Sequence, residues 1–132
     1  MGCNPPKTAG CMRKTILIVD DSAVNRSYLK SILIEHDFDV MEAGRGGEAL
    51  EMIEDKQPDA MILDLLMPGI GGLETLKGLR AKGFSFPVII FTSDDKEETK
   101  KRCLDAGANG FLFKPSKPSQ IFQTIEKALA GK

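Results

Sequence analysis

Apolar and polar positions alternate in blocks along this chain. From Lys14 onward, short apolar runs are separated by longer segments in which apolar residues recur every three or four positions. Short apolar runs are typical of strands, and the longer spacing is typical of helices that bury one face. Their regular alternation predicts repeated βα units around a parallel sheet that helices cover on both faces.

Five apolar runs are the predicted strands. Three are continuously apolar, at residues 16–19, 60–63 and 88–91. Strands buried on both faces need this pattern, so these three belong in the middle of the sheet. The run at 38–43 contains Asp39 and Glu42, and the run at 111–113 is short, so both are predicted at edges. The expected fold is a flavodoxin-like (βα)5 three-layer sandwich with strand order 2-1-3-4-5.

The fourth helical segment differs from the others. Residues 94–102 contain no apolar residue, and only Cys103, Leu104 and Ala106 then offer packing. A segment with so few apolar contacts should be the loosest element of the fold. A merely solvated surface helix explains this segment equally well.

Composition limits the classes of function. The chain has 132 residues, of which 42% are hydrophobic, and this suffices for one domain without disulfides. We expect residues 1–13 to be a flexible lead-in and residues 14–132 to form the domain. A net charge of −1 favours neither nucleic acid nor an anionic membrane. The three cysteines lack zinc-site spacing and fit a reducing cytoplasm, and no apolar run is long enough to span a membrane.

Polar residues follow the predicted strands at the end where a parallel sheet binds ligands. They are Asp20 and Asp21 after the first strand, Asp64 after the third, Thr92 and Ser93 at the end of the fourth, and Lys114 after the fifth. Taken singly, each has a structural explanation: Asp21 could cap a helix, and Asp64 could start a turn. Together, they should converge on one rim of the sheet.

Three carboxylates on adjacent strands repel one another unless a cation or a proton neutralises them. Oxygen ligands without histidine or cysteine indicate Mg²⁺, with Mn²⁺ as the alternative. Phosphoryl transfer needs positive charge on the phosphoryl oxygens, which a divalent cation and Lys114 could supply. Asp64 is then left as the nucleophile that forms an acyl phosphate.

Four motifs occur in order along the chain: Ile-Leu-Ile-Val-Asp-Asp at 16–21, Asp-Leu-Leu-Met-Pro-Gly-Ile-Gly-Gly at 64–72, Phe-Thr-Ser at 91–93 and Phe-Lys-Pro at 113–115. In these motifs and their spacing, the chain from Lys14 to Lys132 resembles the receiver domain of bacterial two-component response regulators, the chemotaxis regulators included. Four motifs in register make the resemblance specific.

The resemblance implies a role for each site residue. Asp64 would be the phosphoacceptor. The metal would be bound by Asp20, Asp21, Asp64 and the backbone carbonyl of Leu66. Lys114 and Thr92 would contact the phosphoryl group, and the peptide bond between Lys114 and Pro115 would be cis. Thr92 and Phe111 are the implied switch residues. Phe111 stands where many members have a tyrosine, so a partner would find no hydroxyl there, and a permanently buried Phe111 is equally plausible.

By the same resemblance, the chain is a cytoplasmic signalling phosphoprotein of a phosphorelay, not a turnover enzyme. A histidine kinase or phosphotransfer protein would donate the phosphoryl group, and the face of the fourth helix, fifth strand and fifth helix would meet a downstream protein. We expect no direct contact with nucleic acid or membrane, and a monomer or a phosphorylation-dependent dimer. The chain is either a stand-alone receiver or part of a longer regulator. The alternatives are a degenerate interaction module that is never phosphorylated, a flavodoxin-like cofactor carrier, and a phosphohydrolase.

Overall fold

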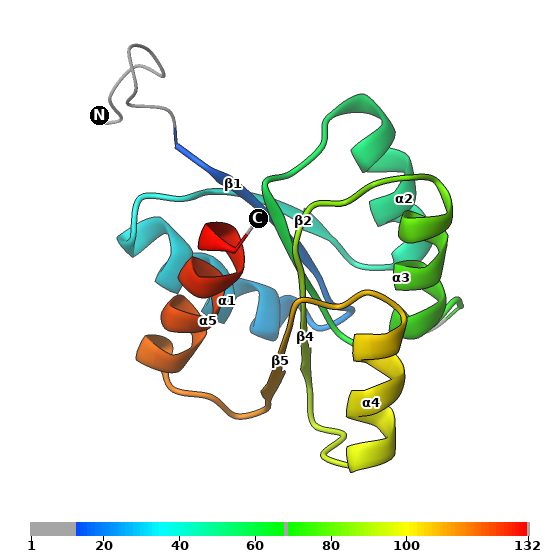
Figure 1. Cartoon of the computed structure of the whole chain (residues 1–132). Coiled ribbons are helices and arrows are strands. Elements are labelled where there is room, and N and C mark those ends of the chain that lie inside the picture. The colour runs from blue at the N-terminus through cyan, green and yellow to red at the C-terminus, as the bar shows by residue number, and fades with distance from the viewer. Residues whose placement is uncertain (1–12, 68, 132) are drawn as a thin grey trace.

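The computed structural model describes residues 13–67 and 69–131, in which five strands and five helices alternate (Figure 1). In chain order they are β1 (Thr15–Val19), α1 (Ala23–Glu35), β2 (Asp39–Ala43), α2 (Gly46–Asp55), β3 (Ala60–Leu63), α3 (Gly72–Ala81), β4 (Val88–Thr92), α4 (Glu97–Asp105), β5 (Gly110–Phe113) and α5 (Pro118–Ala130). Every predicted strand is present, and no bound differs from the prediction by more than one residue.

All neighbouring strands are parallel, and their order is β2-β1-β3-β4-β5. The predicted flavodoxin-like fold is therefore confirmed. The continuously apolar strands β1, β3 and β4 lie in the middle and are fully buried, whereas β2 and β5, at the edges, are mostly half-buried. The order in which strands are added to the sheet reverses between β1 and β3. The ends of these two strands are paired, so Asp20 and Asp64, which follow them, lie side by side.

Helices cover the two faces of the sheet as separate layers (Figure 1). Because side chains alternate along a strand, Ile16 and Ile18 of β1 pack with α1 and α5 on one face. Leu17 and Val19 pack on the other face with α2 and α3. Apolar cores therefore cover both faces of the sheet.

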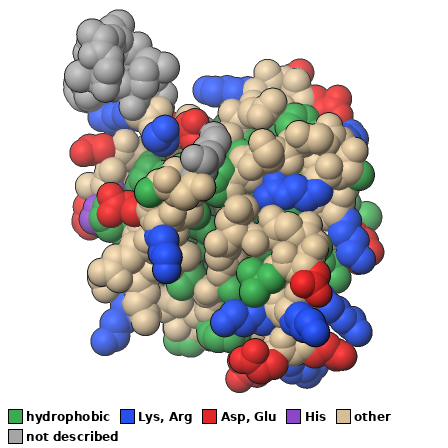
Figure 2. All heavy atoms as spheres, viewed as in Figure 1, with side chains coloured by type: hydrophobic (Ala, Val, Ile, Leu, Met, Phe, Trp, Pro, Cys, Tyr) green, Lys and Arg blue, Asp and Glu red, His purple; other side chains and the backbone are tan. Residues whose placement is uncertain are grey.

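Helix α4 buries only one side chain, that of Cys103. Leu104 was expected to help pack this helix, but it is 45% exposed. Charged side chains of both signs gather over α4 in the space-filling view (Figure 2). The expectation of a weakly packed fourth helix therefore agrees with its burial.

Arg80, near the end of α3, holds the carboxyl end of α4 in place. Its Nη2 and Nε atoms donate hydrogen bonds to the carbonyl oxygen of Gly107 at 2.8 and 3.2 Å. Nη1 donates to the Phe84 carbonyl at 2.9 Å, and Nη2 donates to Asn109 Oδ1 at 3.0 Å. Gly107 has a φ of 108°, which glycine adopts without strain. One guanidinium thus ties α3 to the loop between α4 and β5.

The expectations about the N-terminal lead-in and about two of the cysteines concern residues that the structure mostly does not describe. The lead-in over residues 1–13 lies outside the described residues except for Arg13, and Cys3 and Cys11 also lie there. In the described part of the chain, no helix combines the length and the apolar character that a membrane crossing requires.

Candidate functional site

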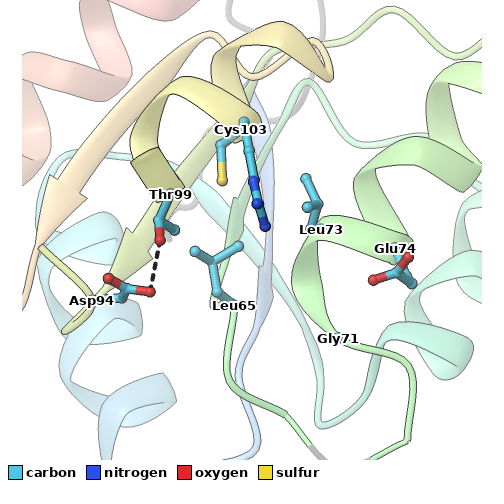
Figure 3. Close-up of a pocket in the computed structure, with 8 residues that line it drawn as sticks. Leu65, Gly71, Leu73, Glu74, Asp94, Thr99 and Cys103 are labelled. Atoms are coloured by element: carbon cyan, nitrogen blue, oxygen red, sulfur yellow. Dashed lines mark hydrogen bonds between the residues drawn. The ribbon is translucent and has the colours of Figure 1, made fainter. Parts of the chain in front are cut away.

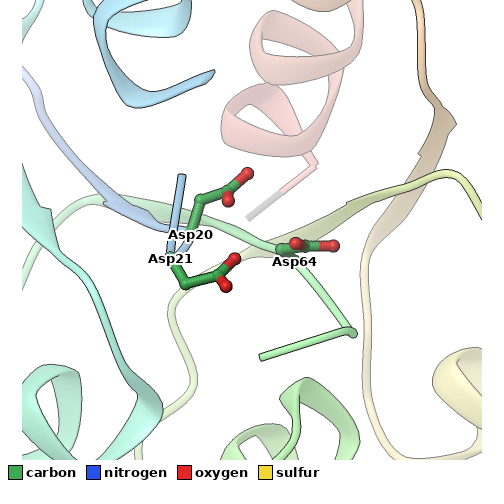
Figure 4. Close-up of side chains that lie close together, drawn as sticks. All are labelled: Asp20, Asp21 and Asp64. Atoms are coloured by element: carbon green, nitrogen blue, oxygen red, sulfur yellow. The ribbon is translucent and has the colours of Figure 1, made fainter. Parts of the chain in front are cut away.

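Asp20, Asp21 and Asp64 meet at the carboxyl rim of the sheet (Figure 4). One carboxylate oxygen from each lies within 4.8 Å of the others. Asp20 and Asp64 are buried, with 2% and 7% exposure, and Asp21 is exposed. The convergence predicted from the strand ends is therefore present.

The chain just after β1 fixes the position of Asp20. Its backbone N–H donates to the carbonyl of Ala43 at 3.1 Å, which extends the pairing of β1 with β2 by one residue. Its Oδ1 accepts a hydrogen bond from the N–H of Ser22 at 2.9 Å. Ser22 in turn caps α1, because its hydroxyl oxygen accepts from the N–H of Asn25 at 3.3 Å. The turn that starts α1 therefore also orients the Asp20 carboxylate.

Asp64 is held by β1 and by the start of α3. Its N–H donates to the carbonyl of Val19 at 2.9 Å, so it continues the ladder between β1 and β3. Gly72, the first residue of α3, lies directly against the backbone of Asp64 and Leu65. A Cβ atom at Gly72 would overlap the Asp64 carbonyl oxygen and come within 2.7 Å of the Leu65 Cα. Only glycine allows α3 to begin this close to the acidic cluster.

Lys114 reaches into the cluster from the end of β5. Its Nζ atom lies 2.9 Å from Asp20 Oδ2 and 3.5 Å from Asp64 Oδ2. The side chain is 19% exposed. The peptide bond between Lys114 and Pro115 is cis. The ammonium therefore sits between two buried carboxylates and partly neutralises both.

Opposing effects act on the pKa of Asp64. Burial raises the pKa of the Asp64 carboxyl above its ordinary value, the positive charge of Lys114 opposes this rise, and the nearby Asp20 carboxylate adds to it. Lys114 alone thus leaves excess negative charge at the rim. A further cation would relieve this repulsion.

Thr92, at the end of β4, is fully buried. Its carbonyl accepts the N–H of Lys114 at 2.8 Å, which connects it to the residue that supplies the ammonium. Its hydroxyl oxygen accepts the N–H of Asp94 at 3.3 Å. Thr92 therefore connects the rim to the segment that leads into α4.

The Asp94 carboxylate binds the first turn of α4. Its Oδ1 accepts the N–H of Lys96 at 3.1 Å, and its Oδ2 accepts the hydroxyl of Thr99 at 2.9 Å (Figure 3). These bonds hold the pKa of Asp94 below its usual range. Asp94 also lines a pocket of about 180 Å³ between α3 and α4, with Leu65, Leu73 and Cys103 among its walls.

Two further predicted site residues are Leu66 and Phe111. The N–H of Leu66 points toward Asp64 Oδ1 at 3.5 Å, and the Leu66 side chain is 62% exposed. Phe111 in β5 is half-buried. Its ring packs edge to face against that of Phe113, with 5.2 Å between the two ring centroids.

Gly72 was not singled out from the sequence. Its role depends on the distance between the start of α3 and the end of β3, and a single sequence does not give this distance. The run of glycines at 69, 71 and 72 was a signal of tight backbone geometry, but it did not show which glycine approaches Asp64.

Comparisons with known proteins agree with this geometry. Residues 16–126 match the response regulator receiver domain family. The chain is 37% identical over 119 residues to the nitrate/nitrite response regulator protein NarL of Escherichia coli K12, covering 89% of this chain and 55% of NarL. It is 34% identical over 116 residues to the DNA-binding transcriptional activator EvgA of the same strain, covering 87% of this chain and 57% of EvgA. The chain thus spans about half the length of these curated relatives.

A solved structure shows the same likeness in three dimensions. The Vibrio cholerae chemotaxis protein CheY4 superposes with a TM-score of 0.83 at 30% sequence identity, covering 88% of this chain and 98% of that one. The fold of this chain thus occurs in a solved structure of similar sequence.

Proposed function

Since the chain belongs to the response regulator receiver domain family, which comprises signalling modules rather than enzymes, we propose that Asp64 accepts a phosphoryl group from a partner protein. The observation that carries this proposal is the meeting of three carboxylates with the ammonium of Lys114 at one rim. A cluster with this excess of negative charge is suited to a cation and a phosphoryl group.

In the proposed transfer, a carboxylate oxygen of Asp64 attacks the phosphorus of a phosphohistidine. A P–O bond forms as the P–N bond breaks, and the electron pair stays on the imidazole nitrogen, which then takes up a proton. Lys114 is close enough to Asp64 to follow the charge onto the phosphoryl oxygens. The hydroxyl of Thr92 would donate a hydrogen bond to the same group once it is bound.

The donor set of the rim fits Mg²⁺, or Mn²⁺ in its place. All three clustered side chains are carboxylates, and two of them are buried beside a single ammonium. Asp20, Asp21, Asp64 and the backbone carbonyl of Leu66 would hold the ion. Bound there, it would supply positive charge to the phosphoryl oxygens.

A receiver domain implies a histidine kinase or a histidine phosphotransfer protein as its donor. Val24, at the start of α1, and Leu66, two residues after Asp64, have apolar side chains that are 78% and 62% exposed. Apolar side chains so close to an acidic cluster favour a protein as the donor, because a small phosphate ester would leave them in water.

We propose that the face of α4, β5 and α5 binds a downstream protein and that phosphorylation changes this binding. We also propose that the protein works in the cytoplasm. Phosphorylation adds about −1.5 to −2 charges at the rim. Thr92 and Lys114 would move toward these charges, and Phe111 has a half-buried ring that can follow Thr92. We expect no nucleic-acid contact from this domain, whose net charge is −1, and a monomer or a phosphorylation-dependent dimer.

The acceptor assignment is tested by Asp64→Asn. We expect the parent to gain a label from a phosphodonor in the presence of Mg²⁺ that both acid and base remove, as they do an acyl phosphate, and the variant to lose at least nine-tenths of it, because an amide is a poor nucleophile. Phosphate content and mass spectrometry measure the label. Asp37→Asn, an exposed site far from the rim, serves as the matched control and should label like the parent.

If Asp64→Asn gained as much acyl phosphate as the parent, the assignment of Asp64 as the acceptor would be contradicted. A parent that takes up no label and binds no Mg²⁺ at millimolar concentration would instead favour the degenerate interaction module.

A further inference from the structure

Arg26 lies on α1 and bonds to the backbone just behind the acidic cluster. Its Nη1 atom donates a hydrogen bond to the carbonyl oxygen of Asp20 at 2.6 Å. Its Nε atom donates to Glu42 Oε1 on β2 at 3.1 Å. The Arg26 side chain is only 21% exposed. One guanidinium thus joins α1, the end of β1 and the edge strand β2.

The carbonyl that Arg26 binds belongs to the peptide group between Asp20 and Asp21. This group is planar, so a hydrogen bond to its oxygen fixes the direction in which the chain continues to Asp21. Asp20 is held independently through its N–H and both carboxylate oxygens. Asp21 is exposed, so its placement depends on the orientation of the preceding peptide.

Glu42 keeps the guanidinium of Arg26 in place. Its Oε1 accepts from Arg26, and its Oε2 lies 3.5 Å from Nζ of Lys30, one turn further along α1. Two cations on one helix therefore flank a single carboxylate on β2. Lys30 shares Glu42 with Arg26 and makes no hydrogen bond to Asp20 in the described contacts, which makes it a matched control.

We propose that Arg26 is a positioning residue that holds the peptide between Asp20 and Asp21 in the orientation from which both carboxylates face Asp64. The consequence for cation binding rests on the proposed function, because it assumes that the rim binds Mg²⁺. The consequence for Asp21 itself does not, since it concerns the metal-free chain.

A merely structural role for Arg26 leads to different expectations. If Arg26 only fastened α1 to β2, its loss would lower stability while the folded molecules kept an unchanged rim. Removal of Lys30, which is fastened to the same carboxylate, would then have a similar effect. A positioning role instead predicts a local change at Asp21 and a weaker cation site in molecules that remain folded.

The test uses the full chain with ¹⁵N labelling and three variants. Arg26→Met removes all donors at similar length, Arg26→Lys restores a cation that can reach one of the two partners, and Lys30→Met is the control. Amide signals of residues 20–22 are recorded without metal, and Mg²⁺ is then titrated. Urea unfolding of each variant is measured in parallel. If Arg26→Met does not fold, Arg26→Leu, which also lacks donors, replaces it with the same expected result.

For Arg26→Met we expect shifted and broadened signals at Asp21 and Ser22, and a Kd for Mg²⁺ raised by about tenfold. Arg26→Lys should recover part of the affinity, and Lys30→Met should stay within about twofold of the parent. Parent-like signals at Asp21 in the Arg26→Met or Arg26→Leu chain would overturn the positioning role. If the parent itself binds no Mg²⁺, the proposed function fails, and the metal-free signals at Asp21 still decide the role of Arg26.

Discussion

At the scale of single residues, Gly72 makes the tightest approach to the acidic rim. We predict that Gly72→Ala lowers the free energy of unfolding by roughly 2 to 3 kcal/mol, because the new Cβ displaces the backbone of Asp64 and Leu65. The same displacement should weaken Mg²⁺ binding. Urea unfolding and Mg²⁺ titration of the variant measure the two effects.

Gly47→Ala is the control for this change. Gly47 lies in α2, and a Cβ there would meet nothing within 4 Å. Alanine should therefore stabilise the helix by up to about 1 kcal/mol and leave the rim unchanged. If the two substitutions had equal effects, the close contact at Gly72 would not matter for stability.

Asp64 adds repulsion that the fold tolerates. Its carboxylate is buried beside that of Asp20, and burial raises its pKa. We predict that, without divalent cations at neutral pH, Asp64→Asn raises the free energy of unfolding by about 1 kcal/mol, since the neutral amide keeps the shape and removes the charge. Chemical denaturation with a chelator present measures this change. An unchanged or lower stability would show that the ion pair with Lys114 already offsets the repulsion.

The sequence located some site residues and missed others for one physical reason. Asp20, Asp64 and Lys114 immediately follow strands, so strand order alone brought them together. Gly72 and Arg26 act through contacts with the backbone of other elements. Residue type and spacing do not reveal such contacts, because they depend on where a helix crosses the strand end.

At the scale of elements, α4 is held mainly at its two ends. Asp94 binds the first turn through Lys96 and Thr99, and Arg80 binds the loop after the last turn. Between these ends, only Cys103 is buried. Because the pKa of Asp94 is lowered, its contribution is present at neutral pH and is lost as the pH falls through that lowered value.

We predict that Asp94→Ala speeds amide hydrogen exchange in the first turn of α4 and leaves the loop at Gly107 nearly unchanged. The first turn loses its two acceptors, whereas the bonds of Arg80 remain. Exchange measured residue by residue by NMR checks this. Asp95→Asn, an exposed neighbour, is the control. Equal acceleration along all of α4 would mean that the helix opens as a unit.

Element types followed from hydrophobic spacing, but packing within α4 did not. Apolar stripes predicted α1 and α5, and strand polarity correctly placed β2 and β5 at the edges. Leu104 was expected to pack, yet it faces solvent. In a helix with three apolar residues close together, spacing does not decide which of them the sheet covers, because that depends on how the loops at both ends turn the helix.

At the scale of the whole molecule, the rim and α4 are connected through Thr92, whose hydroxyl accepts from Asp94. If Thr92 turns toward a bound phosphoryl group, the segment that begins α4 loses this contact. We predict that a stable phosphoryl mimic with Mg²⁺ changes amide exchange over residues 94–106, and changes it little in α2. Unaltered exchange in α4 with the mimic demonstrably bound would contradict this coupling.

The overall arrangement was predictable because local and global signals agree. Three continuously apolar runs indicated a sheet covered on both faces, and the polar edge strands matched the order 2-1-3-4-5, which the structure has. The switch was not predictable to the same degree. Phe111 is half-buried with its ring against that of Phe113, and its movement depends on how β5 packs in a second conformation.

The anchor at Gly107 has a mechanical consequence. Helix α4 has nine residues and is about 13 Å long, and Arg80 grips it at the end opposite the rim. If the bonds of Asp94 are released, the helix can pivot there and moves most at its other end, so a tilt of about 10° would carry the Glu97 end through roughly 2 Å. Small rearrangements at the end of β4 would thus produce a larger displacement of the first turn of α4, which would change the surface that a partner protein contacts.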